Sequence, residues 1–200
     1  GRSIIFVRRD GAQSGVWIVD ARGGQPRRLL NGGYSPKISP DGKKVVVSTA
    51  RVYNPMLRGE KGSLEVANLE SLESLTSVAT ADAVEPTWSP NSKRIAFWRF
   101  ESGDRELWTV GADGSDPKHV DTGSRVHWSP VWTERGIFYI SDHGGLAQVW
   151  RIRVDEDTGE VTAAAEPVTV GAGQSMWHLS ATPSGDRLAW VSHTMRSRVL

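Results

Sequence analysis

Polar side chains recur at two fixed positions ahead of four prolines in this chain. Five and three residues before each proline stand Ser35 and Lys37, Glu85 and Thr87, Arg125 and His127, and His178 and Ser180. If the fold gathers them, their carboxylate, guanidinium, ammonium and imidazole groups could pair with polar groups of a ligand. The candidate ligand-binding residues are therefore Ser35, Lys37, Glu85, Arg125, His127 and His178.

The spacing of these side chains does not favour a metal-binding site. His127 and His178 stand at different positions of the pattern, and there is no compact ligand spacing such as His-x-x-x-His. Asp155, Asp157 and Glu166 imitate three positions of a calcium loop, but Glu160 occupies the place that needs glycine. We expect neither a metal site nor a cofactor.

Catalytic motifs are also missing from the sequence. There is no Cys to act as a nucleophile, no Gly-x-Ser-x-Gly elbow, and no Walker or dinucleotide-binding glycine motif. The sequence therefore favours a chain that is not an enzyme by itself.

The charge balance and the apolar runs exclude some partners. Lys and Arg number 24 against 23 Asp and Glu, so no net field favours nucleic acid or an anionic membrane surface. No apolar run approaches the length of a membrane span. The chain opens at Gly1 on a strand-like segment without a signal peptide, so we expect it to be part of a longer polypeptide.

The four prolines mark a repeat of about forty to fifty residues. They are Pro40, Pro90, Pro130 and Pro183, and the segments before them alternate apolar and polar residues. This alternation is typical of a strand with one buried face, so the candidate residues are predicted to line a water-filled channel. Further strands are predicted at 44–47, 94–98, 137–140 and 187–191, at 16–19, 64–67, 107–110 and 149–152, and at 28–30, 76–79, 118–120 and 167–170.

Four short strands per repeat predict an all-β fold, a β-propeller of four-stranded blades. We predict a single domain over 1–200, with partial blades at 1–31 and 175–200 and complete blades at 34–80, 84–121 and 125–170. Three complete blades and two partial ones indicate a fragment of a six-bladed or larger ring, because closure takes about four to eight blades.

Nine Trp are unusual in a chain of this length. Large flat side chains could fill the wedges between neighbouring blades. The pattern assigns Trp88 and Trp128 to the same repeat position. We expect replacement of either one by Ala to lower the free energy of unfolding by about 3–5 kcal/mol.

The longest predicted loop, 51–62, should lie on the same face as the channel mouth. It contains Tyr53, Met56 and Arg58, which are residue types enriched at protein interfaces. We take these three as candidate partner-binding residues, although a plain surface insertion would also explain the loop.

The repeat resembles the Pro-Asp propeller repeat of TolB-like proteins, a WD40-like repeat family. The likeness is clearest over 88–97 and 106–114, is looser over 36–47 and 180–191, and departs at 131–134, where the family has an Asp-Gly turn. The resemblance implies the propeller fold and a periplasmic or extracellular location in a bacterium. It also leaves several functions open, because propellers of this kind serve as scaffolds, as peptidase gates and as lyases.

The sequence favours a non-catalytic scaffold that binds a protein or peptide through its channel-mouth face. The alternatives are the substrate-gating propeller of a larger prolyl-oligopeptidase-type peptidase and a metal-dependent carbohydrate lyase. On the scaffold hypothesis, charge reversal at Glu85 or Arg125 should weaken ligand binding and leave folding nearly intact.

Overall fold

The computed structural model describes residues 2–50, 61–71, 75–101, 104–120, 122, 127–143, 145, 147–169 and 175–193. For Glu101, His127, Ser175 and His193 it describes the backbone alone. Apart from one short 3-10 turn, η1 (Gly11–Gln13), the regular elements of this part are all strands. No helix among the described residues is long and apolar enough to cross a membrane.

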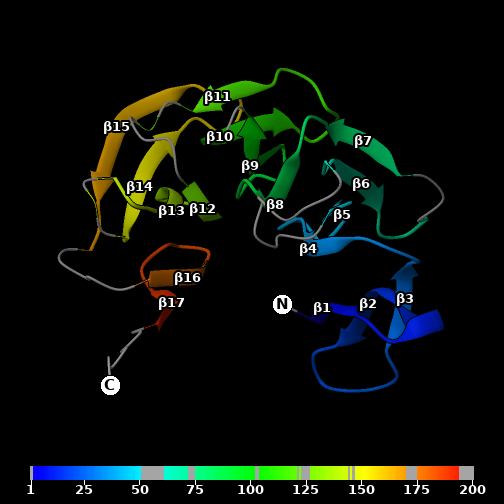
Figure 1. The fold of residues 1–200 in the computed structure, drawn as a ribbon. Helices are drawn as coiled ribbons and strands as arrows, with labels where there is room; N and C mark the ends of the chain where they lie inside the picture. Colours follow the sequence, from blue (N-terminus) through cyan, green and yellow to red (C-terminus); the bar gives the residue numbers. More distant parts are fainter. Residues whose placement is uncertain are drawn as a thin grey trace, which may run out of the picture.

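The strands form five antiparallel sheets, which we number as blades 1 to 5 in chain order (Figure 1). Blade 1 has three strands, blades 2 to 4 have four each, and blade 5 has two. The strands are β1 (Ser3–Arg8), β2 (Gly15–Asp20) and β3 (Arg27–Leu30) in blade 1; β4 (Tyr34–Ile38), β5 (Lys44–Ser48), β6 (Leu64–Asn68) and β7 (Thr76–Ala79) in blade 2; β8 (Ala83–Trp88), β9 (Arg94–Glu101), β10 (Asp104–Gly111) and β11 (Lys118–Val120) in blade 3; β12 (His127–Thr133), β13 (Gly136–Ser141), β14 (Gln148–Val154) and β15 (Val161–Pro167) in blade 4; and β16 (Ser175–Ala181) and β17 (Leu188–His193) in blade 5.

The blades follow one another around an arc, with β4, β8 and β12 toward its centre and β7, β11 and β15 outside (Figure 1). Successive first strands are in contact from β4 to β8, from β8 to β12 and from β12 to β16. The structure therefore confirms the all-β propeller fold, with three complete blades and two partial ones.

The core consists of apolar layers between blades. Val46, Leu64 and Val66 of blade 2 pack against Trp88 and Phe97 of blade 3. Corresponding layers lie between blades 1 and 2, blades 3 and 4, and blades 4 and 5. Blades 2 to 4 thus bury both faces of their sheets, which explains the near-continuous apolar runs in their second strands.

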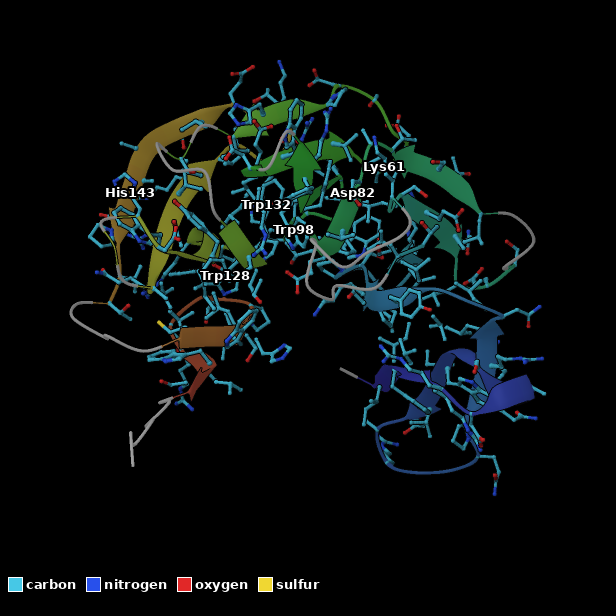
Figure 2. All side chains as sticks on the ribbon, viewed as in Figure 1. Lys61, Asp82, Trp98, Trp128, Trp132 and His143 are labelled. Atoms are coloured by element: carbon cyan, nitrogen blue, oxygen red, sulfur yellow. The ribbon has the colours of Figure 1, made fainter. Side chains whose placement is uncertain are left out.

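Trp side chains contribute to these layers unequally. Trp88, Trp98 and Trp132 are buried, whereas Trp128 is half-buried and Trp177 is 46% exposed. Trp98, Trp128 and Trp132 lie toward the inner side of the arc (Figure 2).

The predicted alignment of the third complete repeat is wrong. Trp88 pairs with Ile95, and the residue that makes the same pair in blade 4, with Ile137, is Trp132 and not Trp128. The first hairpin turn of blade 4 is short, because Thr133 pairs directly with Gly136. Ser129-Pro130 therefore lies inside β12 and not in the turn, so it was aligned with the wrong Ser-Pro dipeptides.

Candidate functional site

The first strand of each of blades 2 to 5 contains a β-bulge at the same place. The pairing register shifts between Tyr34 and Lys37, Val84 and Thr87, Trp128 and Val131, and Trp177 and Ser180. In each bulge the first residue has a left-handed backbone: Ser35 (φ 48°), Glu85 (φ 52°), Ser129 (φ 53°) and His178 (φ 53°). Pro follows in three of the four bulges, where its missing N–H costs no ladder hydrogen bond.

The four bulges meet at one cavity of about 410 Å³ on the inner side of the arc. Its lining includes all four left-handed residues, Ser35, Glu85, Ser129 and His178. The remaining lining residues are Ile5, Phe6, Pro36, Lys37, Pro86, Pro130, Val131, Leu179 and Ser180. We call this space the channel cavity.

The cavity brings together four of the six residues expected to bind a ligand, namely Ser35, Lys37, Glu85 and His178. Arg125 lies outside the described residues, and Ser129 occupies the bulge position expected for it. His127 is the first residue of β12, and its side chain lies outside the described part of the chain.

Strict alternation within the first strands is also wrong at the bulges. The alternation predicts Pro36 and Pro86 on the buried face, and Pro86 is buried, yet both line the channel cavity, because a bulge inserts an unpaired residue and shifts the pleat. The same alternation predicts Thr87 on the channel face, but it is buried and its hydroxyl accepts a hydrogen bond from the backbone N–H of Trp132 (3.2 Å). An X-Pro dipeptide within a predicted strand was the signal for these bulges, since strand prolines occur at edges and bulges.

Glu85 is held by one hydrogen bond within its own blade and one from the next blade. Its Oε2 accepts one from Trp98 Nε1 (2.6 Å) and another from the backbone N–H of Ser129 (2.9 Å). The carboxylate therefore joins its own blade to the bulge of blade 4. Its Oε1 makes no hydrogen bond within the described residues and is the acceptor left for a ligand.

Lys37 and His178 are the exposed members of the set. The Lys37 carbonyl accepts a hydrogen bond from Trp88 Nε1 (2.9 Å), which fixes the strand while the ammonium group stays exposed. Trp128 Nε1 donates likewise to the carbonyl of Met176 (2.8 Å), one blade further on. The cavity thus has walls fixed by indole hydrogen bonds and carries an ammonium, an imidazole and a carboxylate.

The channel-mouth face carries arginines that lie over aromatic rings. The Arg105 guanidinium lies 5.5 Å from the Trp98 ring centre and 6.0 Å from that of Trp128, and Arg9 lies 5.6 Å from that of Tyr34. The candidate partner-binding residues Tyr53, Met56 and Arg58 lie outside the described residues. Within the described part of the chain, no group of three or more His, Asp or Glu could hold a metal ion.

Comparisons with known proteins identify related chains. No protein-family model matches. The Tol-Pal system protein TolB of Anaeromyxobacter dehalogenans is 33% identical over 124 residues, which are 59% of this chain and 27% of that protein. A TolB homologue of Chlorobium chlorochromatii is 29% identical over 139 residues, 68% of this chain and 30% of that protein. The chain therefore spans less than a third of the length of either relative.

Solved structures show the same fold. TolB from Acinetobacter baumannii superposes with a TM-score of 0.73 at 19% identity, covering 98% of this chain and 48% of that one. A puromycin-hydrolysing peptidase from Mycobacterium tuberculosis superposes with a TM-score of 0.59 at 18% identity, covering 95% of this chain and 33% of that one. At such identities the likeness concerns the fold alone.

Proposed function

We propose that this chain, a TolB-like β-propeller, binds a protein or peptide through its channel-mouth face and performs no catalysis itself. The observation that carries the proposal is the set of four left-handed bulges at one cavity. Each non-glycine residue in this backbone region costs roughly 1–2 kcal/mol, and such strain gathers where a site must be preorganised.

The cavity size limits what can enter it. A volume of about 410 Å³ is within the range of small-ligand pockets and far below that of a folded domain. A side chain or the end of an extended segment therefore fits, while the rest of the partner would contact the rim. Lys37 would donate to an acceptor of the bound segment, and Glu85 Oε1 would accept from a donor.

A photo-crosslinking experiment tests the proposal. A photoreactive amino acid replaces Lys37 in one variant and, as the control, Lys43 in another, because Lys43 is an exposed lysine in the turn at the opposite end of blade 2. We expect a specific adduct from position 37 and none from position 43, formed in cells and identified by mass spectrometry.

The captured partner is then purified and titrated against substituted chains. Lys37→Ala and His178→Asn should weaken binding at least about tenfold, and Lys43→Ala should not change it. Asn is chosen at position 178 because it tolerates a left-handed backbone. Unchanged affinity in both channel variants would contradict binding at the cavity.

The second candidate function is the gating propeller of a peptidase, favoured by the fold likeness to the mycobacterial enzyme. An α/β-hydrolase domain in the same open reading frame would support it over the scaffold. For location we propose the periplasm, on the likeness to Tol-Pal system proteins. Fractionation of cells that express the full gene, followed by immunodetection, tests that proposal.

A further inference from the structure

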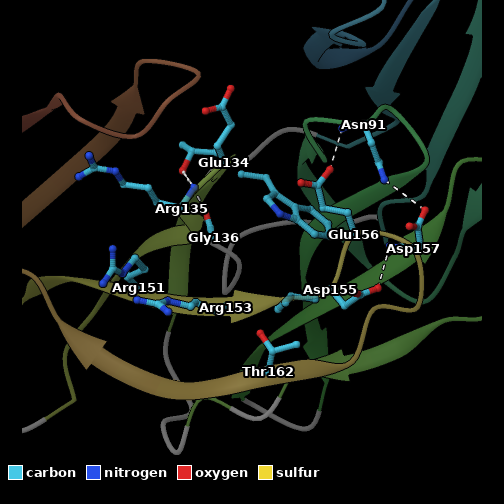
Figure 3. Close-up of a pocket in the computed structure, with 13 residues that line it drawn as sticks. Asn91, Glu134, Arg135, Gly136, Arg151, Arg153, Asp155, Glu156, Asp157 and Thr162 are labelled. Atoms are coloured by element: carbon cyan, nitrogen blue, oxygen red, sulfur yellow. Dashed lines mark hydrogen bonds between the residues drawn. The ribbon is translucent and has the colours of Figure 1, made fainter.

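A hollow at the turn end of blade 4 is larger than the channel cavity. Its volume is about 740 Å³, and its walls come from the Thr133–Gly136 turn, β14 and the turn that follows β14 (Figure 3). The turns between first and second strands and between third and fourth strands lie at the end opposite the channel mouth. We call this space the blade-4 hollow.

The hollow exists because one turn is short. In blades 2 and 3 the first hairpin turn runs from Ser39 to Lys44 and from Ser89 to Arg94, each closed by a backbone hydrogen bond of 2.9 Å. In blade 4, Thr133 pairs directly with Gly136, so the turn lacks two residues that the other blades have. The volume that those residues would fill stays open.

The turn between β14 and β15, which contains Glu156 and Asp157, makes the contact with blade 3 that the short first turn of blade 4 does not make. Between blades 2 and 3, the first turns meet through the backbone N–H of Asp41 and Ser92 Oγ (3.1 Å). Between blades 3 and 4, the backbone N–H of Asn91 instead donates to Glu156 Oε2 (2.7 Å). Asp157 Oδ1 accepts from Lys93 Nζ (2.6 Å) and from Asn91 Nδ2 (3.3 Å).

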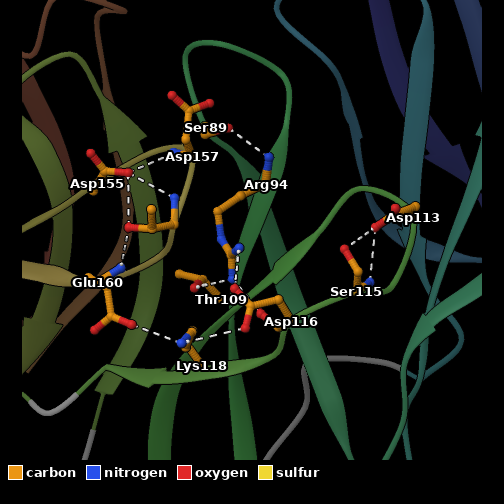
Figure 4. Close-up of polar contacts among 11 residues, drawn as sticks. Ser89, Arg94, Thr109, Asp113, Ser115, Asp116, Lys118, Asp155, Asp157 and Glu160 are labelled. Carbon is orange, nitrogen blue, oxygen red and sulfur yellow. Dashed lines mark hydrogen bonds and ion pairs between the residues drawn. The ribbon is translucent and has the colours of Figure 1, made fainter.

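A third carboxylate, that of Asp155, is used within its own turn. Its Oδ1 accepts hydrogen bonds from the backbone N–H groups of Asp157 (3.0 Å) and Thr158 (2.8 Å) and from Thr158 Oγ1 (3.0 Å) (Figure 4). These bonds hold the pKa of Asp155 below its ordinary value. Three of the four carboxylates that line the hollow are therefore used in the protein's own structure, and the fourth, that of the exposed Glu134, accepts no hydrogen bond from a described residue.

The opposite wall carries three arginines, Arg135, Arg151 and Arg153 (Figure 3). Arg151 Nε donates to Glu166 Oε1 (2.9 Å), and a second, short hydrogen bond runs from its Nη2 to the same oxygen. Arg135 and Arg153 are exposed, and no hydrogen bond or ion pair joins either guanidinium group to a described residue; the Arg135 backbone N–H donates to Thr133 Oγ1 (3.1 Å). Two guanidinium groups in one hollow thus have their donors available.

We propose that the blade-4 hollow binds an oxyanion, a phosphate or carboxylate group, with Arg135 and Arg153 as its donors. The planar guanidinium fork matches both groups, and such charge-assisted hydrogen bonds are about twice as strong as neutral ones. The pair of Arg151 and Glu166 fixes β14 to β15 and keeps the wall in place. The site is separate from the channel cavity, shares no lining residue with it and does not depend on the function proposed for it.

Calorimetric titration of the purified chain at constant ionic strength tests the proposal, with inorganic phosphate in one arm and succinate in the other. Both Arg135→Gln and Arg153→Gln should weaken binding at least about tenfold. Arg22→Gln is the matched control, since Arg22 is an exposed arginine in a turn of blade 1, and it should bind as the wild type does. Binding of phosphate alone indicates a phosphorylated ligand, and binding of succinate alone indicates a carboxylate ligand.

A second measurement needs no substitution. Phenylglyoxal modifies exposed guanidinium groups, and mass spectrometry reports the rate at each arginine. The bound probe should slow modification of Arg135 and Arg153 several-fold while Arg22 reacts at its former rate. The proposal is overturned if neither probe binds the wild type at about 10 mM, if the Arg135→Gln, Arg153→Gln double variant binds normally, or if the three arginines are protected equally.

Discussion

Replacement of Glu85 by Ala should destabilise the fold as well as change the channel. The substitution removes the acceptor of two hydrogen bonds, from the buried Trp98 indole and from the Ser129 backbone. Hydrogen bonds to a charged group contribute about 1.5–3 kcal/mol each, and the half-buried carboxylate favours the lower figure. Glu and Ala are about equally strained at a left-handed position, so backbone strain adds little. We therefore expect a loss of about 3 kcal/mol.

This loss is measurable by urea unfolding, because domains of this kind are stabilised by about 5–15 kcal/mol. Glu85→Gln should lose about 1–2 kcal/mol, since its neutral amide oxygen still accepts hydrogen bonds. Glu106→Ala is the control: Glu106 Oε2 accepts from Trp108 Nε1 (2.9 Å) within one strand and joins no second blade. We expect about 1 kcal/mol or less for it.

The reasoning fails if Glu85→Ala and Glu106→Ala unfold at the same urea concentration with equal slopes. The expectation also differs from the one drawn from the alternating pattern, in which charge reversal at Glu85 leaves folding nearly intact. Periodicity places a side chain on a face, but it does not show that the carboxylate bonds to an adjacent blade.

Three further outcomes are expected. Trp88→Ala should lower the free energy of unfolding by about 3–5 kcal/mol in chemical denaturation. Trp128→Ala should lower it clearly less, because Trp128 is half-buried, and the difference would separate two residues that the sequence pattern assigns to one repeat position. Gly136→Ala should abolish cooperative thermal unfolding, because φ is +115° and a Cβ would stand 2.5 Å from the Ile152 carbonyl oxygen. The Arg151 guanidinium lowers the pKa of Glu166 from 4.5, so its stabilising contribution is present above about pH 4.5 and is lost as the pH falls through the folded-state pKa. Glu166→Gln should therefore flatten the dependence of Tm on pH between about pH 6 and 3, as followed by calorimetry.

The sequence was sufficient for the order of the strands and for all their positions but one, since the outer strand of blade 4 is Val161–Pro167 and not the predicted 167–170. Runs such as 94–98 and 107–110 are largely apolar on both faces because blade 3 packs between blades 2 and 4, and polar turns separate them. Ser35, Lys37, Glu85 and His178 could be placed near one axis because four equivalent strands approach the centre of the arc.

The failures arose where one dipeptide has two structural roles. Ser-Pro stands in a hairpin turn at Ser39-Pro40 and in a bulge at Ser129-Pro130, and spacing alone does not separate these uses. The shortened turn at Thr133–Gly136 shifted the alignment, so Arg125 was selected where Ser129 belongs. The blade-4 hollow was missed for the same reason, since it depends on the absence of turn residues.

The prolines of the bulges also bear on aggregation. Each first strand is the inner edge of its sheet, and an exposed edge is a template on which another chain can add a strand. Pro36, Pro86 and Pro130 have no N–H to offer there, and the bulges twist the edge away from a flat ladder. Blade 5 has Leu179 at this position, so among blades 2 to 5 it alone keeps an N–H at the second residue of the bulge, and strand exchange between molecules would meet the least resistance there.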